Sequence, residues 1–234
     1  MALILSNECV GERVFLMKLQ GLRAAPGQFY MLRPQERLSA PLLGRPISVF
    51  DADEEGLSFL YHMVGQGTAL LAAKRAGEEV QAIGPFGNGF RFADRDLSVI
   101  GGGIGIAPLY YLLKEWKRRF PARKTEAFLG FSLESFMVSA FEDVSGRCQV
   151  NIGGFVTEDA PLAPGPLHVA CGPLPMLRAA QKKAEGNGAE LDLSLEARMA
   201  CGAGACLGCS CATVAGNRRV CKDGPVFSAR EVLL

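Results

Sequence analysis

The chain has 234 residues, which exceeds the usual length of one domain and predicts two modest domains, each with its own core. Its 25 basic and 24 acidic side chains give a net charge of +1, which argues against a broad electrostatic attraction to nucleic acid or anionic lipid. No segment approaches the length of a membrane span, and the first residues lack the basic region of a signal peptide. We therefore expect a cytoplasmic protein with no nucleic-acid or membrane partner and with reduced cysteines.

The first 95 or so residues are predicted to form short strands separated by turns. Turn residues gather at Ala25-Pro26-Gly27, 51–56 and 84–89. The predicted strands are Val14–Leu19, Phe29–Arg33, Ile47–Phe50, Leu57–Val64 and Val80–Ile83. This spacing predicts a small antiparallel barrel or sandwich.

From Leu97 onward, predicted strands alternate with predicted helices. The apolar segment LSVI enters GGGIGIAP, and LYYLLKEWKRRF has the length and apolar spacing of a helix. Further strands are predicted at 126–131, 148–152, 167–171 and 191–196, with a helix over 172–184. The alternation predicts a parallel sheet with crossover helices. Residues 197–234 form a cysteine-rich tail without a periodic pattern.

The tail has cysteines at the spacing of an iron–sulfur site. The spacing C-x4-C-x2-C-x11-C is that of a plant-type [2Fe–2S] cluster, and its members are Cys201, Cys206, Cys209 and Cys221. Glycines suit such a loop, because they accept positive φ and let N–H groups approach sulfur; here they are Gly202, Gly204 and Gly208. A zinc site usually has two C-x2-C pairs, and only one is present. Cys211 is surplus and is expected to be a small buried thiol.

Two further segments offer groups for a phosphate-bearing ligand. GGGIGIAPL (101–109) follows a strand and opens a helix, where backbone N–H groups favour anions, although it lacks the strict G-x-G-x-x-G pattern. Arg45 in LGRPISVF carries the guanidinium that suits a pyrophosphate, and 65–68 is a candidate backbone cradle at the start of a short helix. Each segment alone is a weak signal, since a solvated arginine or a tight turn would look the same.

Taken together and in order, these segments resemble the ferredoxin–NADP reductase superfamily, which joins a β-barrel flavin domain to an α/β nicotinamide-binding domain. The flavin signature resembles residues 45–48, although Ile47 replaces the usual aromatic residue. SLEARMACGAGACLGC and VCKDGPVF more closely resemble the electron-transfer subunits of NAD-dependent (class 1B) dihydroorotate dehydrogenases. The resemblance covers essentially the whole chain.

The resemblance implies an FAD-binding β-barrel domain at 1–95, an NAD-binding α/β domain at 96–196 and a [2Fe–2S] region at 197–234. It implies electron transfer between NAD(H) and the FMN of a separate dihydroorotate dehydrogenase catalytic subunit, through FAD and the cluster, in pyrimidine biosynthesis. The implied assembly is a heterotetramer of two catalytic and two electron-transfer subunits. Because the dihydroorotate site would lie on the partner, we expect no catalytic residue in this chain.

The resemblance also assigns site residues. It implies FAD contacts for Arg45, Pro46, Ile47, Ser48, Leu60, Tyr61, His62, Gly67 and Thr68. It implies NAD(H) contacts for Gly101, Gly102, Gly103, Gly105, Cys171, Gly172 and Pro173. Glu196 is expected either to orient a flavin or nicotinamide edge or to be an ordinary surface carboxylate. Glu134, after the second strand of the α/β region, mildly favours NAD over NADP.

Other functions stay open on the sequence alone. The chain could be a small flavin and iron–sulfur subunit of another NAD(P)H-linked oxidoreductase, of the ferredoxin–NADP or sulfide type. A zinc-stabilised binding module, with purely structural glycine turns, is an alternative of a different class. The chain ends in VLL and not in the aromatic residue that stacks on flavin in many reductases, so we expect the partner or the cluster loop to cover the flavin.

Overall fold

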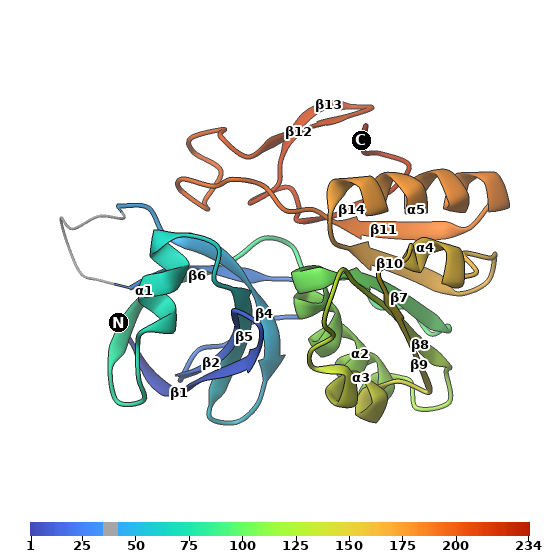
Figure 1. Cartoon of the computed structure of the whole chain (residues 1–234). Coiled ribbons are helices and arrows are strands. Elements are labelled where there is room, and N and C mark those ends of the chain that lie inside the picture. The colour runs from blue at the N-terminus through green and yellow to red at the C-terminus, as the bar shows by residue number, and fades with distance from the viewer. Residues whose placement is uncertain (35–41) are drawn as a thin grey trace.

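The computed structural model describes residues 1–34 and 42–234. A β-barrel and an α/β sheet lie side by side, and the cysteine-rich segment crosses one edge of both (Figure 1). Among the described residues, none of the helices has the length and apolar character that a membrane crossing needs.

The N-terminal part is a closed antiparallel barrel with the strand order β1-β2-β5-β4-β3-β6. Its strands are β1 (Ala2–Gly11), β2 (Val14–Gln20), β3 (Phe29–Arg33), β4 (Arg45–Ala52), β5 (Gly56–His62) and β6 (Glu79–Phe86). Alternate side chains fill the interior, among them Met17, Leu57 and Phe59, all fully buried. The barrel predicted from the strand spacing is therefore confirmed.

Strand β1 is missing from the sequence prediction because polar residues interrupt its apolar run. One of them, Asn7, forms hydrogen bonds through both the nitrogen and the oxygen of its side-chain amide. It donates to the carbonyl oxygens of Leu71 and Lys74 at 2.9 and 2.8 Å, and accepts a hydrogen bond from the Tyr61 hydroxyl at 3.0 Å. Asn7 thus ties the barrel to helix α1 (Gln66–Ala72) and the turn that follows it.

The second part is a six-stranded sheet with the order β14-β11-β10-β7-β8-β9. Its parallel strands are β7 (Leu97–Gly102), β8 (Thr125–Phe131), β9 (Arg147–Ile152), β10 (Leu167–Cys171) and β11 (Glu190–Ser194). The predicted parallel sheet with crossover helices is confirmed. Helices α2 (Ala107–Arg119) and α3 (Val138–Val144) pack on one face, and α4 (Val156–Asp159) and α5 (Leu174–Asn187) on the other.

The cysteine-rich tail has more regular structure than its sequence suggests. A hairpin of β12 (Ser210–Thr213) and β13 (Gly216–Arg219) follows the cysteine loop. The three-residue strand β14 (Val226–Ser228) then joins the sheet, antiparallel to β11. A strand this short has no readable alternation, which is why the sequence missed it. The predicted domain boundaries themselves stay predictions.

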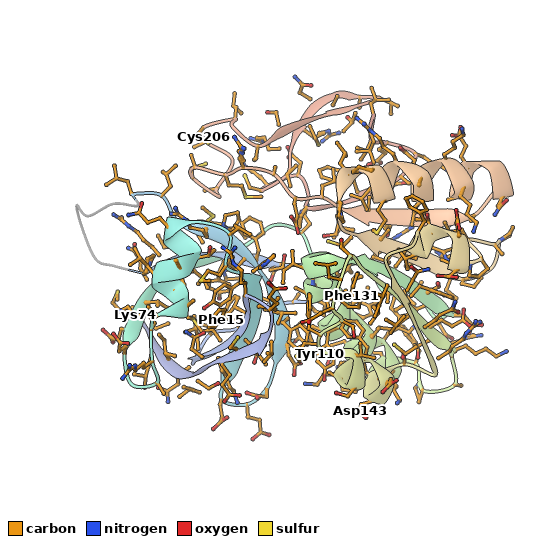
Figure 2. The ribbon with its side chains drawn as sticks, in the orientation of Figure 1. Phe15, Lys74, Tyr110, Phe131, Asp143 and Cys206 are labelled. Carbon is orange, nitrogen blue, oxygen red and sulfur yellow. The ribbon has the colours of Figure 1, made fainter. Side chains whose placement is uncertain are left out.

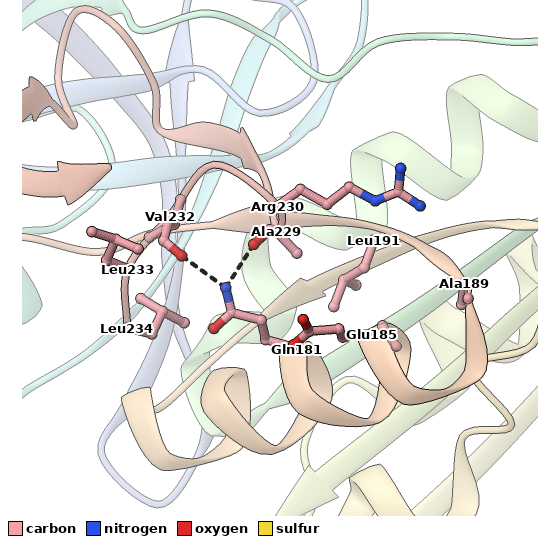
Figure 3. Close-up of a pocket in the computed structure, with 11 residues that line it drawn as sticks. Gln181, Glu185, Ala189, Leu191, Ala229, Arg230, Val232, Leu233 and Leu234 are labelled. Atoms are coloured by element: carbon pink, nitrogen blue, oxygen red, sulfur yellow. Dashed lines mark hydrogen bonds between the residues drawn. The ribbon is translucent and has the colours of Figure 1, made fainter. Parts of the chain in front are cut away.

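The last residues run along α5. The side-chain amide of Gln181 donates to the carbonyl oxygens of Ala229 and Val232, at 2.6 and 2.8 Å (Figure 3). A pocket of about 540 Å³ lies between this segment and the helix. None of the residues that line this pocket was predicted as a site residue.

Helix α2 joins the two parts. Tyr110 stacks on Phe50 of β4 with ring centroids 4.4 Å apart, and lies at the boundary between barrel and sheet (Figure 2). One turn further along, Lys114 forms an ion pair with Asp51 at 2.7 Å and also donates to the carbonyl oxygen of Ala52. Apolar stacking and a part-buried ion pair therefore hold the barrel against the sheet.

Phe50→Ala is expected to lower the free energy of unfolding by about 3–5 kcal/mol, because it leaves a cavity under Tyr110. Urea unfolding followed by circular dichroism measures the loss. The control is Phe155→Ala, whose side chain is 73% exposed and whose loss should cost no more than about 0.5 kcal/mol. Equal losses in the two variants would contradict this account of the interface.

Candidate functional site

A cavity of about 320 Å³ lies where the barrel, the α/β sheet and the cysteine-rich tail meet. It brings together eight of the nine residues predicted to contact FAD: Arg45, Pro46, Ile47, Ser48, Leu60, Tyr61, His62 and Thr68. They come from β4, β5 and the start of α1, which the barrel places next to one another. The ninth, Gly67, lies directly under Arg45.

The Gly67 position has room for no side chain while Arg45 keeps its place. A Cβ added there would lie 2.0 Å from Arg45 Nε. The hydroxyl of Thr68 holds the preceding turn by accepting from the N–H groups of Val64 and Gly65, at 2.9 and 3.1 Å. A guanidinium therefore rests on a bare backbone turn at the edge of the cavity, an arrangement that can hold a phosphate group.

Two ionisable side chains in the cavity have perturbed pKa values. Burial raises the pKa of Tyr61, whose hydroxyl is bound to Asn7. Glu196 remains accessible from the cavity, yet the protein packed around it raises its pKa by desolvation. The cavity therefore contains the guanidinium of Arg45 and the carboxyl group of Glu196, whose pKa is raised.

The two glycine-containing turns predicted to contact NAD(H) lie against each other at the carboxyl ends of β7 and β10. Gly101 and Cys171 are direct neighbours in the parallel pairing. A Cβ on Gly105 would lie 2.5 Å from the Cys171 carbonyl oxygen and 2.6 Å from Gly172 Cα. One on Gly102 would lie 2.9 Å from Pro173 Cδ. Close packing of two turns therefore requires these glycines, whether or not a ligand is bound.

This pair of turns also borders the cavity. Helix η1 (Gly103–Ile106) precedes α2, and Ile104, Ala107 and Pro108 line the cavity wall. Gly103 has φ +53° and open space around its Cβ position. In open α/β sheets, ligands bind outside the carboxyl ends of the strands, and these turns occupy that place.

The four cysteines predicted as cluster ligands lie on the two segments that flank the cavity residues Met199 and Pro225, and N–H to sulfur contacts link them in pairs. The N–H of Cys206 points at the sulfur of Cys201 at 3.5 Å, that of Gly208 at Cys206 at 3.5 Å, and that of Cys221 at Cys209 at 3.4 Å. In the part of the chain that the structure describes, no three metal-ligating side chains converge into a closed metal site. The donor set and the inward N–H groups nevertheless fit a sulfur-rich cluster.

The cysteine loop takes left-handed conformations at three positions. Gly202 and Gly204 have φ +68° and +83°, as the sequence predicted. The third is Leu207, with φ +58°, and not Gly208. Leu207 is 61% exposed beside the exposed Cys206, which lies at the outer end of the tail (Figure 2). Cys211 is half-buried on β12, next to the core under the loop.

Close contacts hold this loop on the barrel. A Cβ on Gly202 would lie 2.7 Å from Met31 Cγ. The second cysteine segment is held by Asn88, which follows β6. The backbone N–H of Asn88 donates to the Gly224 carbonyl oxygen at 2.6 Å, and its side-chain amide donates to the Asp223 carbonyl oxygen at 3.2 Å. Both cysteine-bearing segments are therefore fixed to the rim of the barrel.

Sequence reasoning missed several cavity residues. From the tail and the end of β11 they are Leu195, Ala197, Met199 and Pro225; from elsewhere they are Phe29, Val64, Ile104, Ala107 and Pro108. The only signal for the first group is that it flanks the cysteine motif. Its place agrees with the expectation that the cluster loop covers the flavin side of the barrel.

Comparisons with known proteins agree with this arrangement. Residues 196–233 match the family model of the iron–sulfur cluster binding domain of dihydroorotate dehydrogenase B. The chain is 36% identical to the electron transfer subunit of dihydroorotate dehydrogenase B (NAD(+)) from Clostridium acetobutylicum, over 99% of this chain and 96% of that one. It is 39% identical to the subunit of the same name from Caldanaerobacter subterraneus, over 99% and 97%.

Solved structures show the same fold. A chain from the structure of an NADH-dependent reduced ferredoxin-NADP oxidoreductase superposes with a TM-score of 0.87 at 26% identity, covering 100% of this chain and 90% of that one. The FAD/NAD-binding domain of a nitric oxide dioxygenase from Vibrio cholerae superposes with a TM-score of 0.69 at 14% identity, over 82% and 96%, and supports the fold alone. By its near-complete alignment with the curated relatives, the chain belongs to the family of electron transfer subunits of NAD(+)-dependent dihydroorotate dehydrogenase B.

Proposed function

We propose that this chain transfers electrons between NAD(H) and the catalytic subunit of a dihydroorotate dehydrogenase, through FAD and a [2Fe–2S] cluster, in pyrimidine biosynthesis. One observation carries the proposal: the segments that bear the four cysteines also wall the cavity lined by the predicted FAD residues. FAD exchanges electron pairs with a nicotinamide and single electrons with a cluster, so it suits a position between the two.

In this proposal, Arg45 holds the pyrophosphate of FAD with two parallel charge-assisted hydrogen bonds, and the bare turn at Gly67 leaves it the room to do so. The β4 and β5 residues, with Pro225 and Met199 from the tail, exclude water from the rest of the cavity. Glu196 adds a carboxyl group to the cavity wall, and desolvation raises its pKa.

The nicotinamide would approach the turns at 101–105 and 171–173 near Gly103, the glycine among them whose Cβ position faces open space. Glu134, exposed just after β8, would accept from the ribose hydroxyls and disfavour the extra phosphate of NADP. The cysteine thiolates would hold the cluster, with the N–H groups of Cys206, Gly208 and Cys221 directed at sulfur.

We further infer that the partner is an FMN-containing catalytic subunit and that two copies of each subunit assemble. The exposed tip formed by Cys206 and Leu207 supports a docking surface at the outer end of the cluster loop. Exposed apolar side chains at Leu42, Leu43 and Val64 add to the apolar surface of the chain that a partner can bury.

Cys221→Ser is expected to strip iron and sulfide from the purified protein, since it removes the one ligand contributed by the second segment. Cys211→Ser should leave iron content and visible absorbance at the wild-type level, because Cys211 lies outside the ligand set. Iron and sulfide assays with a visible spectrum decide the matter. Loss of the cluster in Cys211→Ser with retention in Cys221→Ser would overturn the ligand assignment.

Arg45→Ala is expected to weaken FAD binding by roughly tenfold to a hundredfold, the effect of losing a charge-assisted pair worth about 1.5–3 kcal/mol. FAD content after gel filtration, together with titration of the flavin-free protein, measures the change. Arg75→Ala, at an exposed arginine beyond helix α1, is the matched control and should bind FAD normally. Equal FAD affinity in the two variants would remove Arg45 from the site.

Mixing the purified chain with a dihydroorotate dehydrogenase B catalytic subunit should give a two-plus-two complex that reduces orotate with NADH. Analytical ultracentrifugation gives the stoichiometry, and Cys221→Ser is the control that should lose the coupled reaction. The similarity to the ferredoxin-NADP oxidoreductase favours ferredoxin as the second candidate acceptor. Rapid ferredoxin reduction without orotate reduction would decide for that function.

A further inference from the structure

We propose that Arg219 is a positioning residue of the cluster site, which joins the two cysteine-bearing segments and raises the reduction potential of the cluster through its positive charge. The inference rests on the proposed function, because it presumes that the four cysteines hold a [2Fe–2S] cluster. It concerns a part of the tail to which the cysteine spacing assigns no role.

Arg219 closes a tight turn around Cys221. The Asp223 carboxylate accepts from Arg219 Nε at 2.9 Å, from Nη2 at 3.0 Å and from the Arg219 backbone N–H at 2.8 Å. In return, the Arg219 carbonyl oxygen accepts from the N–H groups of Lys222 and Asp223, at 3.1 and 2.8 Å. Cys221 lies inside this ring of hydrogen bonds and is 2% exposed. The position of its sulfur is therefore set by the Arg219–Asp223 pair.

The free side of the guanidinium reaches the other cysteine segment. Arg219 Nη1 donates to the carbonyl oxygen of Gly204 at 3.4 Å. Gly204 lies between Cys201 and Cys206, and the stem of Lys222 packs over it, with a Cβ position 2.8 Å from Lys222 Cδ. The planar guanidinium of Arg219 thus binds the Asp223 carboxylate through Nε and Nη2 and the Gly204 carbonyl oxygen through Nη1. The single nitrogen of a lysine cannot make all of these bonds.

The same guanidinium lies close to the sulfurs. It bonds to Gly204 between Cys201 and Cys206 and belongs to the turn that carries Cys221, whose N–H points at the Cys209 sulfur. Reduction adds one negative charge to the cluster, so a nearby fixed cation stabilises the reduced form and raises the potential. Asp223 offsets part of this effect. Arg219 and Asp223 should therefore move the potential in opposite directions.

The experiment compares Arg219→Gln, Arg219→Lys and Asp223→Asn in the purified holoprotein, with Arg218→Gln as the matched control. Arg218 is the adjacent cation, but it is exposed on the hairpin, where water and salt screen its charge. Two quantities are measured: the rate at which a chelator removes iron, and the potential of the [2Fe–2S] signal by electron paramagnetic resonance redox titration.

Arg219→Gln should lose iron several times faster than the wild type, and its reduction equilibrium should shift about threefold to tenfold toward the oxidised cluster. A tenfold shift corresponds to about 59 mV for one electron. Arg219→Lys should lose iron faster but keep its potential close to that of the wild type. Asp223→Asn should shift the equilibrium toward the reduced cluster, and Arg218→Gln should change neither quantity appreciably.

A purely structural role would give faster iron loss without these opposite shifts. The proposal is overturned if Arg219→Gln titrates like Arg218→Gln, or if Arg219→Gln and Asp223→Asn shift the potential in the same direction. If Arg219→Gln keeps no iron, the positioning role is supported and the sign of the shift in Asp223→Asn decides the electrostatic one. A wild-type protein without any iron–sulfur signal would refute the proposed function itself, which is a different result.

Discussion

The whole arrangement depends on how closely the cysteine-bearing tail is packed against the rim of the barrel. At Gly202 and at Gly87 the backbone has no room for even a methyl group, since a Cβ would meet Met31 Cγ at 2.7 Å and Pro225 Cδ at 2.5 Å. Asn88 adds hydrogen bonds to the carbonyl oxygens of Lys222, Asp223 and Gly224, which directly follow Cys221. Close packing and hydrogen bonds therefore fix the position of the cysteine-bearing segments relative to the cavity.

A second junction fixes the glycine turn at 101–105 relative to the rim of the barrel. Helix α2 begins directly after the glycine turn and packs its Tyr110 and Lys114 onto β4, the strand that also carries Arg45. The barrel, the glycine turn and the tail therefore meet at one cavity because each is tied to β4 or to the strands beside it.

Much of this molecule follows from its sequence. Regular turns predicted a barrel or sandwich, strand–helix alternation predicted the parallel sheet, and residues 45–48 and 60–62, which the resemblance assigned to one ligand, line one cavity. Local sequence patterns gave wrong or missing predictions where tertiary contacts determine the conformation. Asn7 looks like a break in a strand and is instead a half-buried hydrogen-bonding link, Leu207 takes the conformation expected of Gly208, and β14 is too short to show a period. Met199 and Pro225 could not be predicted as cavity residues, because neither residue type indicates a binding site. Only the folded position of the tail against the barrel places them in the cavity wall.

The pairing of β14 with β11 makes the intervening stretch an insertion between two neighbouring strands of the sheet. Ser194 and Val226 are cross-strand partners, and Leu195 donates its N–H to the Pro225 carbonyl oxygen at 2.9 Å, so the chain leaves the sheet and returns to it at adjacent positions. Excising residues 195–225 and closing the gap with a tight turn would convert β11 and β14 into an ordinary hairpin. The sheet would keep all six strands, while the barrel cavity would lose one wall. The inserted residues are also tied to the segment after β14, because Val214 donates its N–H to the Glu231 carbonyl oxygen and Leu233 donates to that of Ala212, so their removal would also uncover the C-terminal residues.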